Sequence, residues 1–330
     1  MSNEVDIREN DILQQDHVLL ETILIDHSRP KNGKKLAHII WATDNYESLG
    51  PGYGENEQIS IPSITGDHGS LIQPRVKKTK EEQQARARDK GEVFTPAWIC
   101  NKQNNLIDAA WFGGTSPFNV EEEKGWTANT DSIPFPTTDG KTWQDYVKDT
   151  RLEMACGEAP YLVSRYNVVT GEDIPVDDRI GLLDRKLRVV GENAADAKEW
   201  FKWAVEAYRS IYGFEWQGDN LVLAREAMLY TFIDYHVARF GKMPTKAQTR
   251  KIAEIVSWNL WQMDGLKGVI PGSCYNKVTK EYTLFGEVIE HVEPCEGCEK
   301  DDLFKHNGIY CRIMDWDKRK TIRFIDLLKK

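Results

Sequence analysis

The residues best suited to hold a small ligand lie in the stretch 151–165, where an apolar run that contains an acid precedes a group of small residues. The loop consists of Ala155, Cys156, Gly157 and Glu158, and Pro160 and Tyr161 follow it. Small residues let backbone N–H groups approach a ligand, and a proline fits the first turn of a helix. The stretch therefore predicts a strand, a tight loop and a helix at a nucleotide-type site. An ordinary strand-to-helix turn is the alternative, because the G-x-G-x-x-G spacing is absent.

Two later strands are also expected to end in acids. Residues 212–216 predict a strand that ends near Glu215, and residues 255–264 predict one that ends at Asp264. Helical patterns separate the strands at 179–190, 196–211, 219–236 and 245–255. This alternation predicts an α/β fold with helices on both faces of a mainly parallel sheet and a ligand at the carboxyl ends of the strands. An adenosyl ligand would meet a loop at Gly157, an acid for its ribose at Glu215 and a polar group for its base at Asp264.

The remaining chain is organised around this core. Residues 1–90 predict an N-terminal α+β segment with a basic helix, and residues 91–330 predict the ligand-binding domain, in which 272–312 is a candidate cysteine-containing insertion. Thr95 is expected to cap a helix that begins at Pro96. Other helices are expected at 16–25, 75–90 and 321–330, and other strands at 37–42, 282–289 and 309–314.

Composition sets the broad class of protein. The 330 residues are 40% hydrophobic and 29% charged with a formal net charge of −9, which predicts a globular chain whose overall charge does not favour nucleic acid. The basic residues of 75–90 could lie along a phosphate backbone or could simply face water. The sequence has no apolar run of membrane-spanning length and no signal-peptide pattern, and its six cysteines are mostly unclustered. We therefore expect a soluble cytoplasmic protein with reduced thiols and no membrane partner.

Four short motifs follow one another in a recognisable order. They are Gly-Glu-Val-Phe-Thr-Pro at 91–96, Leu-Glu-Met-Ala-Cys-Gly-Glu-Ala-Pro-Tyr-Leu at 152–162, Tyr-Gly-Phe-Glu at 212–215 and Asn-Leu-Trp-Gln-Met-Asp at 259–264. In this order they resemble four motifs of the S-adenosylmethionine-dependent adenine-N6 DNA methyltransferases of restriction-modification systems. The first two resemble the G-x-[FV]-[FY]-T-P motif and the A-C-x-x-x-P-[FY]-L form of the first Rossmann motif. The last two resemble the segment with the ribose-binding acid and the strand that contacts the adenine. The resemblance covers residues 75–330 and implies a Rossmann-like methyltransferase fold.

The resemblance implies that the chain binds S-adenosylmethionine and acts on DNA. The residues that it assigns to the cofactor are Phe94, Thr95, Pro96, Ala155, Cys156, Gly157, Glu158, Pro160, Tyr161, Glu215, Trp216, Asp264 and Gly265. Glu158 could accept a hydrogen bond from the cofactor's ammonium group, could repel its carboxylate or could face solvent. Cys156 is expected to be a packing residue rather than a nucleophile, because no histidine lies near it in sequence.

The catalytic tetrapeptide of that family, [DNS]-P-P-[YFW], does not occur in the sequence. In the family it positions the target amino group and stacks on a flipped base. Residues 321–330 resemble the segment that precedes it, and we assign no catalytic residue. One expectation is that a second methyltransferase or restriction subunit supplies the motif. The alternatives are a catalytically inactive regulatory subunit that binds DNA or a partner, and a methyltransferase with a substrate other than DNA.

A cysteine pair later in the chain has metal-ligand spacing. Cys295 and Cys298 form a C-x-x-C, and with Cys274 and Cys311 they could make a four-thiolate zinc site. The possible substitutes are His291 and His306. A reduced cysteine pair at a turn is the alternative, because only one C-x-x-C is present.

Overall fold

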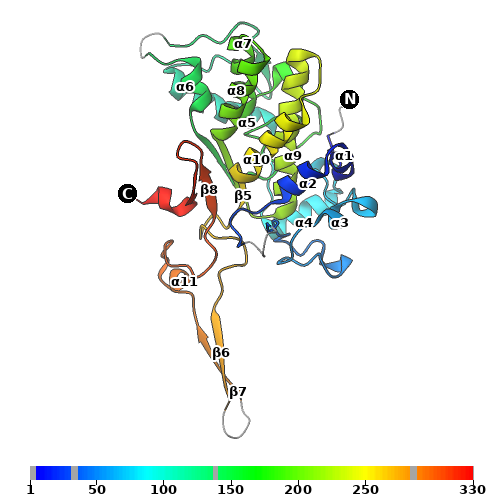
Figure 1. Ribbon diagram of the computed structural model, residues 1–330, viewed down its shortest axis with the longest axis vertical. Helices are drawn as coiled ribbons and strands as arrows, with labels where there is room; N and C mark the ends of the chain where they lie inside the picture. Colours follow the sequence, from blue (N-terminus) through cyan, green and yellow to red (C-terminus); the bar gives the residue numbers. More distant parts are fainter. Residues whose placement is uncertain (1–4, 31–35, 137–139, 283–287, 330) are drawn as a thin grey trace.

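The centre of the fold is a three-stranded parallel sheet (Figure 1). The computed structural model describes residues 5–30, 36–136, 140–282 and 288–329. The strands of the sheet, in spatial order, are β3 (Arg151–Met154), β4 (Ile211–Glu215) and β5 (Leu260–Gln262). Met154 lies opposite Phe214, and Glu215 lies opposite Gln262. The predicted parallel α/β core is therefore present, although the described residues form three strands of it rather than a full Rossmann sheet.

Four helices connect the strands in the predicted order. They are α7 (Leu182–Asn193), α8 (Ala197–Arg209), α9 (Gly218–Phe240) and α10 (Lys246–Asn259). Helix α8 begins where the Asp196 carboxylate accepts hydrogen bonds from the N–H groups of Lys198 and Glu199, which have no partner within the helix. Its apolar face, which includes Trp200 and Tyr208, is buried. Helix α10 begins with a capping box between Thr245 and Gln248.

The two faces of the sheet are covered by different elements. Successive side chains of a strand point to opposite faces. In β4, Ile211 belongs to the main core with the helices, whereas Phe214 packs in a second cluster with Trp261 and Ile313. Ile313 lies in a C-terminal hairpin of β8 (Arg312–Asp315) and β9 (Lys320–Arg323). The expectation of helices on both faces is therefore wrong for the described residues of β4 and β5, because this hairpin covers the second face.

The segment before residue 91 shares the main hydrophobic core. Its helices are α1 (Glu9–Gln15), α2 (His17–Leu24), α3 (Ile61–Ile64) and α4 (Lys80–Lys90), with 3₁₀ turns at Glu47–Leu49, Gly66–His68 and Arg75–Lys77. Helix α2 packs against α10 and α9. Arg225 of α9 joins the segment to the sheet, because its guanidinium donates to the carbonyl oxygens of Ile25 and Leu260. The strand predicted at 37–42 is absent: His38 and Ile40 form only isolated bridges.

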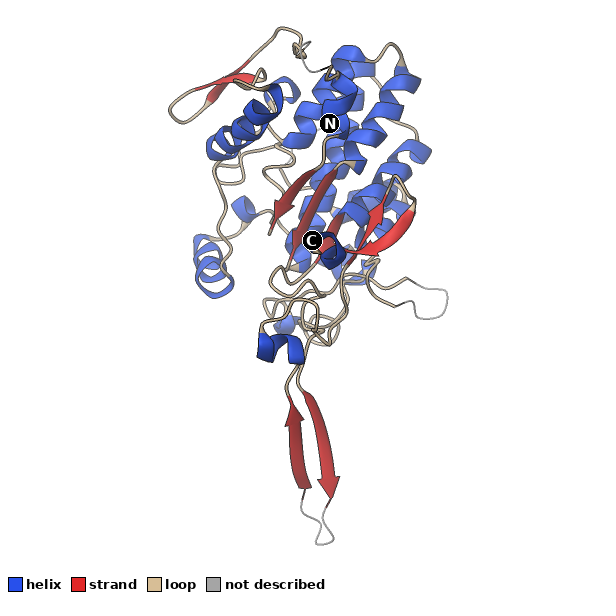
Figure 2. Cartoon of the chain, turned by 90° about the vertical axis from the view of Figure 1, so that its left-hand side faces the viewer, coloured by secondary structure: helices blue, strands red, loops and turns tan. Residues whose placement is uncertain are grey.

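A hairpin projects from the body (Figure 2). Its strands are β6 (Lys277–Tyr282) and β7 (Val288–Glu293), and the short helix α11 (Glu296–Lys300) follows them. The predicted strand 282–289 spans residues 283–287, which lie outside the described residues. The remaining elements are α5 (Ala97–Phe112), β1 (Asn119–Glu121), β2 (Trp126–Ala128), α6 (Trp143–Lys148) and 3₁₀ turns at Val176–Asp178 and Phe324–Leu328. No described helix is both long and apolar enough to cross a membrane.

The local predictions around the loop and the C-terminal tail need correction. Residues 160–165 form turns rather than a helix, because the carbonyl oxygens of Tyr161 and Leu162 accept the N–H groups of Leu182 and Leu183 at the start of α7. Thr95 is not a cap: α5 begins at Ala97, and no side chain caps it. Of the predicted helix at 321–330, residue 330 lies outside the described residues, and the described part continues as β9 and a 3₁₀ turn rather than as a helix.

Candidate functional site

A cavity of about 520 Å³ opens at the carboxyl ends of β3 and β4, beneath the segment that joins α4 to α5. Most of the residues predicted to bind the cofactor line it, namely Phe94, Thr95, Ala155, Cys156, Gly157, Pro160, Tyr161, Glu215 and Trp216. The first, second and third sequence motifs therefore meet at one cavity, although 121 positions separate Phe94 from Glu215. A cavity of this size is within the range of small-molecule sites.

The loop after β3 has an unusual backbone. Ala155 and Ala159 have φ of 50° and 61°, and Gly157 between them has φ of 52°. Left-handed conformations cost energy for alanine and little for glycine. The turn aims the Gly157 N–H at β4, where it donates to Oε2 of Glu215 at 2.9 Å. The strained loop is therefore held in place from the next strand.

Glu215 is fixed at both oxygens. Oε2 accepts from Gly157, and Oε1 accepts from the N–H of Gln217 at 3.1 Å. Burial raises the pKa of Glu215 above its usual value. A carboxylate can accept about four hydrogen bonds, so Glu215 keeps acceptor capacity for a ligand in the cavity.

Glu153 is a cavity residue that the sequence interpretation did not single out. It lies in β3, is 9% exposed and lines the cavity. Its Oε2 is buried without a hydrogen-bond partner, and burial raises its pKa well above the usual value. The available signal was its position in the second motif, two residues before the loop. An unsatisfied buried carboxylate in a cavity indicates a cationic or hydrogen-bond-donating ligand.

A buried ion-pair network holds the segment over the cavity. Arg86 of α4 pairs with Glu92, and its Nη2 lies 2.7 Å from Oδ2 of Asp219 in α9. Although burial acts to raise it, the Arg86 guanidinium helps to hold the pKa of Asp219 below its usual value. Tyr46 donates to the same carboxylate at 2.8 Å, and Asn220 donates to Glu92 at 3.0 Å. Arg86 therefore positions the segment and is not available to contact a phosphate backbone.

Acidic groups predominate in the lining. It contains five carboxylates, from Glu55, Asp89, Glu92, Glu153 and Glu215, and one lysine, Lys90. Of these, Glu92 pairs with Arg86, Asp89 pairs with Arg88, and burial raises the pKa values of Glu153 and Glu215. The cavity therefore offers several acidic groups as hydrogen-bond partners for a ligand.

Other predicted residues lie elsewhere. Glu158 is buried, and its oxygens accept from the Tyr166 hydroxyl at 2.5 Å and from the Arg75 N–H at 2.6 Å. Of the three alternatives for Glu158, the one in which it faces solvent is wrong, because the chain around Arg75 covers it. Pro96 immediately precedes α5. Cys156 is buried and its pKa is raised well above the usual value by burial, which fits a packing role.

Asp264 and Gly265 lie outside the lining of the main cavity. Asp264 lines an adjoining cavity of about 190 Å³, which shares Trp216 with the first. Its Oδ1 accepts from the N–H groups of Leu266 and Lys267, which shapes the turn after β5. Gly265 packs against Phe214, and an added Cβ would lie 2.8 Å from that ring.

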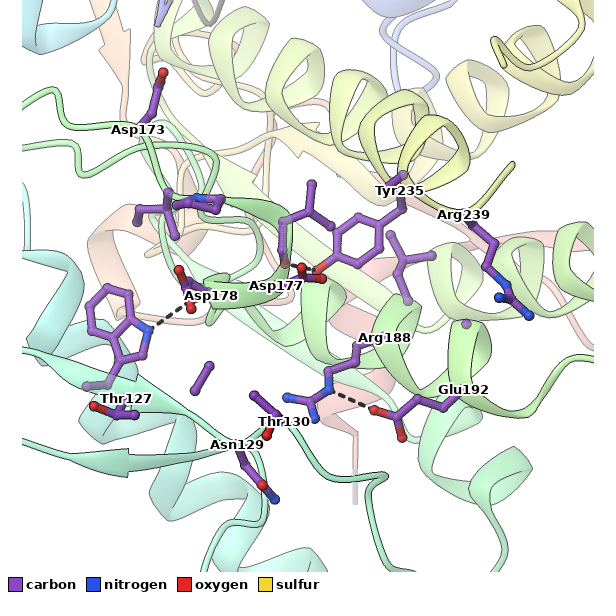
Figure 3. Close-up of a pocket in the computed structure, with 18 of the residues that line it drawn as sticks. Thr127, Asn129, Thr130, Asp173, Asp177, Asp178, Arg188, Glu192, Tyr235 and Arg239 are labelled. Carbon is purple, nitrogen blue, oxygen red and sulfur yellow. Dashed lines mark hydrogen bonds and ion pairs between the residues drawn. The ribbon is translucent and has the colours of Figure 1, made fainter. Parts of the chain in front are cut away.

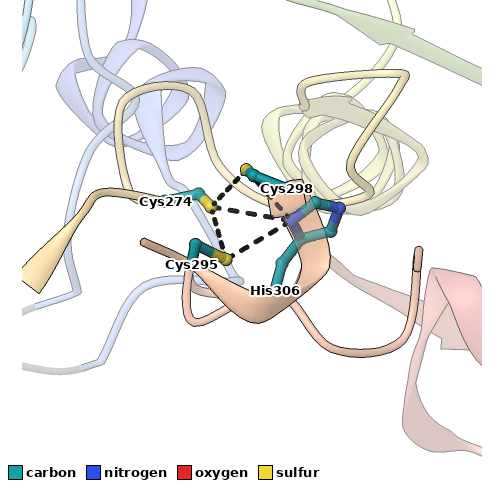
Figure 4. Close-up of side chains that lie close together, drawn as sticks. All are labelled: Cys274, Cys295, Cys298 and His306. Carbon is teal, nitrogen blue, oxygen red and sulfur yellow. Dashed lines mark hydrogen bonds between the residues drawn. The ribbon is translucent and has the colours of Figure 1, made fainter. Parts of the chain in front are cut away.

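Three cysteines and one histidine gather beyond this turn (Figure 4). The residues are Cys274, Cys295, Cys298 and His306, and their candidate ligand atoms all lie within 4.8 Å of one another. This set could bind zinc. His306 takes the place predicted for Cys311, whose buried thiol instead donates to the Gln262 carbonyl at 3.2 Å. The other proposed substitute, His291, lies on β7 and pairs with Glu281 at 3.2 Å.

A larger and more open cavity, of about 1030 Å³, lies between β2, α7 and α9 (Figure 3). Arg188 and Glu192 form an ion pair there at 2.8 Å, and Trp126 donates to the Asp178 carbonyl at 2.8 Å. It contains no residue of the four motifs. Size alone therefore does not make it the functional site.

No protein-family model, curated protein or solved structure matches this chain.

Proposed function

We propose that the chain binds S-adenosylmethionine in the cavity at the ends of β3 and β4 and is the cofactor-binding part of a DNA adenine-N6 methyltransferase of a restriction-modification system. In this proposal the three strands and their helices are part of a Rossmann-like methyltransferase fold, and another chain supplies the catalytic tetrapeptide. The observation that carries the proposal is the convergence of Phe94, Gly157 and Glu215 on one cavity. These residues come from the three motifs that resemble the family's cofactor loop, first Rossmann motif and ribose acid.

The chemistry of the lining fits the ligand. Glu215 offers two acceptor positions to the ribose hydroxyls, and Phe94 and Tyr161 offer apolar surface around the methionine part. Glu153, whose protonated form is favoured in the ligand-free protein, would release its proton and pair its unpartnered oxygen with the α-ammonium group. Glu158, for which an ammonium contact was one of three alternatives, does not line the cavity.

The charge of the cavity also supports a sulfonium ligand. S-adenosylmethionine carries a sulfonium and an ammonium against one carboxylate, whereas S-adenosylhomocysteine lacks the sulfonium charge. An acidic lining stabilises the first ligand more than the second. We assign the adenine to the neighbourhood of Trp216, which lines both the main cavity and the adjoining cavity of Asp264.

The edge of the sheet supports a role for a second chain. β3 pairs only with β4 among the described strands, and Leu152 and Met154 of β3 are 42% and 72% exposed. An unpaired strand edge is a template for another strand. We therefore place the strand that carries the catalytic tetrapeptide on a second methyltransferase or restriction subunit. The exposed basic residues Lys77, Lys80 and Arg88 near and within α4 are the candidate DNA contacts.

Two experiments test these proposals in order. Isothermal titration of the purified chain with S-adenosylmethionine is expected to show binding that Glu215→Ala weakens at least tenfold, or about 1.4 kcal/mol. No heat at high ligand concentration, together with no change in Glu215→Ala, would disprove cofactor binding.

The second experiment measures transfer of a tritiated methyl group to DNA. The chain alone is expected to be inactive, and activity is expected on addition of a polypeptide, encoded beside it, that carries the tetrapeptide. Cofactor binding without transfer in either case would favour the alternative, in which the chain is a regulatory subunit that binds DNA or a partner.

A further inference from the structure

We propose that Cys274, Cys295, Cys298 and His306 bind one Zn²⁺ in a closed structural site that fixes the projecting β6–β7 hairpin to the body. The distances among the ligand atoms match a tetrahedral ion. Sγ of Cys274 lies 3.4 Å from Sγ of Cys295 and 3.6 Å from Sγ of Cys298. With Zn–S and Zn–N bonds of about 2.3 and 2.0 Å, a tetrahedron has S–S edges of about 3.8 Å and S–N edges of about 3.5 Å.

The histidine completes the same tetrahedron. Nδ1 of His306 lies 3.6 Å from the sulfurs of Cys274 and Cys298 and 3.7 Å from that of Cys295. Nδ1 of His306 is thus nearly equidistant from the three sulfurs. A central ion shared by four ligands requires this arrangement, whereas a disulfide between two of the cysteines does not. Soft thiolates with one imidazole select zinc over magnesium or calcium. Four protein ligands leave no open position, so the site is structural rather than catalytic.

The surrounding residues orient the ligands. The Asn307 N–H donates to Sγ of Cys295 at 3.3 Å, and its side chain bonds both the N–H and the carbonyl of Tyr275, beside Cys274. The His306 N–H donates to the Tyr310 hydroxyl at 2.8 Å. Such outer hydrogen bonds are typical of ligand sets that hold a metal.

Close packing inside the C-x-x-C loop also fits a metal site. An added Cβ on Gly297 would lie 2.6 Å from the backbone nitrogen and from Nδ1 of His306. The turn between Cys295 and Cys298 therefore needs a residue without a side chain, so that the imidazole can approach both sulfurs. The glycine at position 297 therefore allows the three cysteines and His306 to come together.

The position of the cluster explains what the ion would do. Cys274 precedes β6 by three positions, and Cys295 follows β7 by two, so both ends of the hairpin meet at the cluster. His306 lies on the chain that returns to β8. Every β7 side chain is exposed, and a two-stranded hairpin alone is marginally stable in water. A bound ion would cross-link these three segments and hold the base of the hairpin rigid.

Metal content tests the ligand set. The full chain, purified and dialysed against metal-free buffer, is expected to retain about one zinc per chain. Cys298→Ser and His306→Ala are expected to retain less than about a tenth of that amount. The matched controls are Cys311→Ser and His291→Ala, which change the same residue types outside the cluster and are expected to keep the ion.

A second measurement uses the unmutated chain, so it tests the site even if a variant fails to fold. Replacing the ion with Co²⁺ in the unmutated chain is expected to give tetrahedral visible bands and a thiolate-to-cobalt charge-transfer band. Chelation is expected to speed proteolysis between residues 275 and 294 severalfold, with the body remaining intact. Wild-type protein with negligible zinc and no such cobalt spectrum would overturn the site. Zinc retained equally in all four variants would overturn the ligand set, and unchanged proteolysis after chelation would overturn its role at the hairpin.

Discussion

The N–H group of Gly157 donates to Oε2 of Glu215 at 2.9 Å, and this contact joins the loop after β3 to the end of β4. The two groups meet because Met154 and Phe214 are paired in the parallel register, which brings the two strand ends level. The acid therefore supports the loop and borders the cavity at the same time. Its loss would affect both the shape of the cavity and the hydrogen bonds available to a ligand.

Glu215→Gln is expected to weaken S-adenosylmethionine binding by about 10- to 100-fold, which corresponds to the 1.5 to 3 kcal/mol of a hydrogen bond to a charged group. The amide keeps the size of the side chain but presents an N–H₂ group to the N–H of either Gly157 or Gln217. Isothermal titration measures the change, and circular dichroism checks that the variant is folded. Glu254→Gln, an exposed acid of α10, is the control and should bind normally. Equal affinity in both variants would remove Glu215 from the site.

Glu153→Gln is expected to stabilise the ligand-free protein at pH 8 and to weaken its binding of S-adenosylmethionine. Burial raises the pKa of Glu153 well above its usual value, so the native state favours the protonated form. The stability from this group is fully present below about pH 4.5 and is lost as pH rises through the native pKa. The glutamine does not titrate, so the variant should be more stable at pH 8 by about 1 to 3 kcal/mol.

Urea unfolding at pH 5 and pH 8 measures this difference, and titration calorimetry measures the affinity. A variant that unfolds with the same pH dependence as the wild type would show that Glu153 does not carry the buried charge. A variant that gains stability but binds the cofactor normally would separate the buried acid from the ammonium group.

Arg86→Lys is expected to weaken cofactor binding while leaving a folded protein. Lysine keeps the charge but cannot contact Glu92 and Asp219 through a planar fork, so the segment over the cavity loses part of its support. We expect a loss of about 1 to 3 kcal/mol in the free energy of unfolding. Arg239→Lys, an exposed arginine near the end of α9 and outside this cavity, is the matched control and should change neither quantity. Equal effects of the two changes would contradict the positioning role of Arg86.

The connecting helices were predictable because their signals are local. Asp196 and Thr245 mark the starts of α8 and α10, and apolar residues repeat along one face of α8. The strand predicted at 255–264 is reduced to Leu260–Gln262, because α10 continues to Asn259. Its apolar run suits a buried helix and a buried strand equally well.

The details of the site depended on contacts between distant segments. Glu158 is buried because Arg75 lies over it. No local sequence pattern predicts that contact. Period-two alternation predicts opposite faces for Leu152 and Glu153, but it does not say which face borders a cavity. The choice of His306 rather than Cys311 in the metal cluster likewise depends on the path of the chain after α11.

Glu226→Gln is expected to stabilise the protein at pH 8 and to flatten its pH dependence. Glu226 of α9 is fully buried, and neither of its oxygens has a hydrogen-bond partner in the described part of the chain. Burial raises its pKa well above the usual value, and burial near acidic neighbours also raises the pKa of Glu9 to about 8. Stability from these groups is present below about pH 4.5 and is lost as pH rises through the native pKa values.

The variant removes the titrating group of Glu226 and leaves Glu9 with a neutral amide in place of a neighbouring acid. Its free energy of unfolding should therefore fall less than that of the wild type between pH 5 and pH 8, and at pH 8 it should exceed the wild-type value by about 1 to 3 kcal/mol. Chemical denaturation across this range measures both slopes, with Glu254→Gln as the exposed control. Parallel curves for Glu226→Gln and the wild type would contradict the raised pKa of a buried Glu226, because an acid with its ordinary pKa would not change the slope between pH 5 and pH 8.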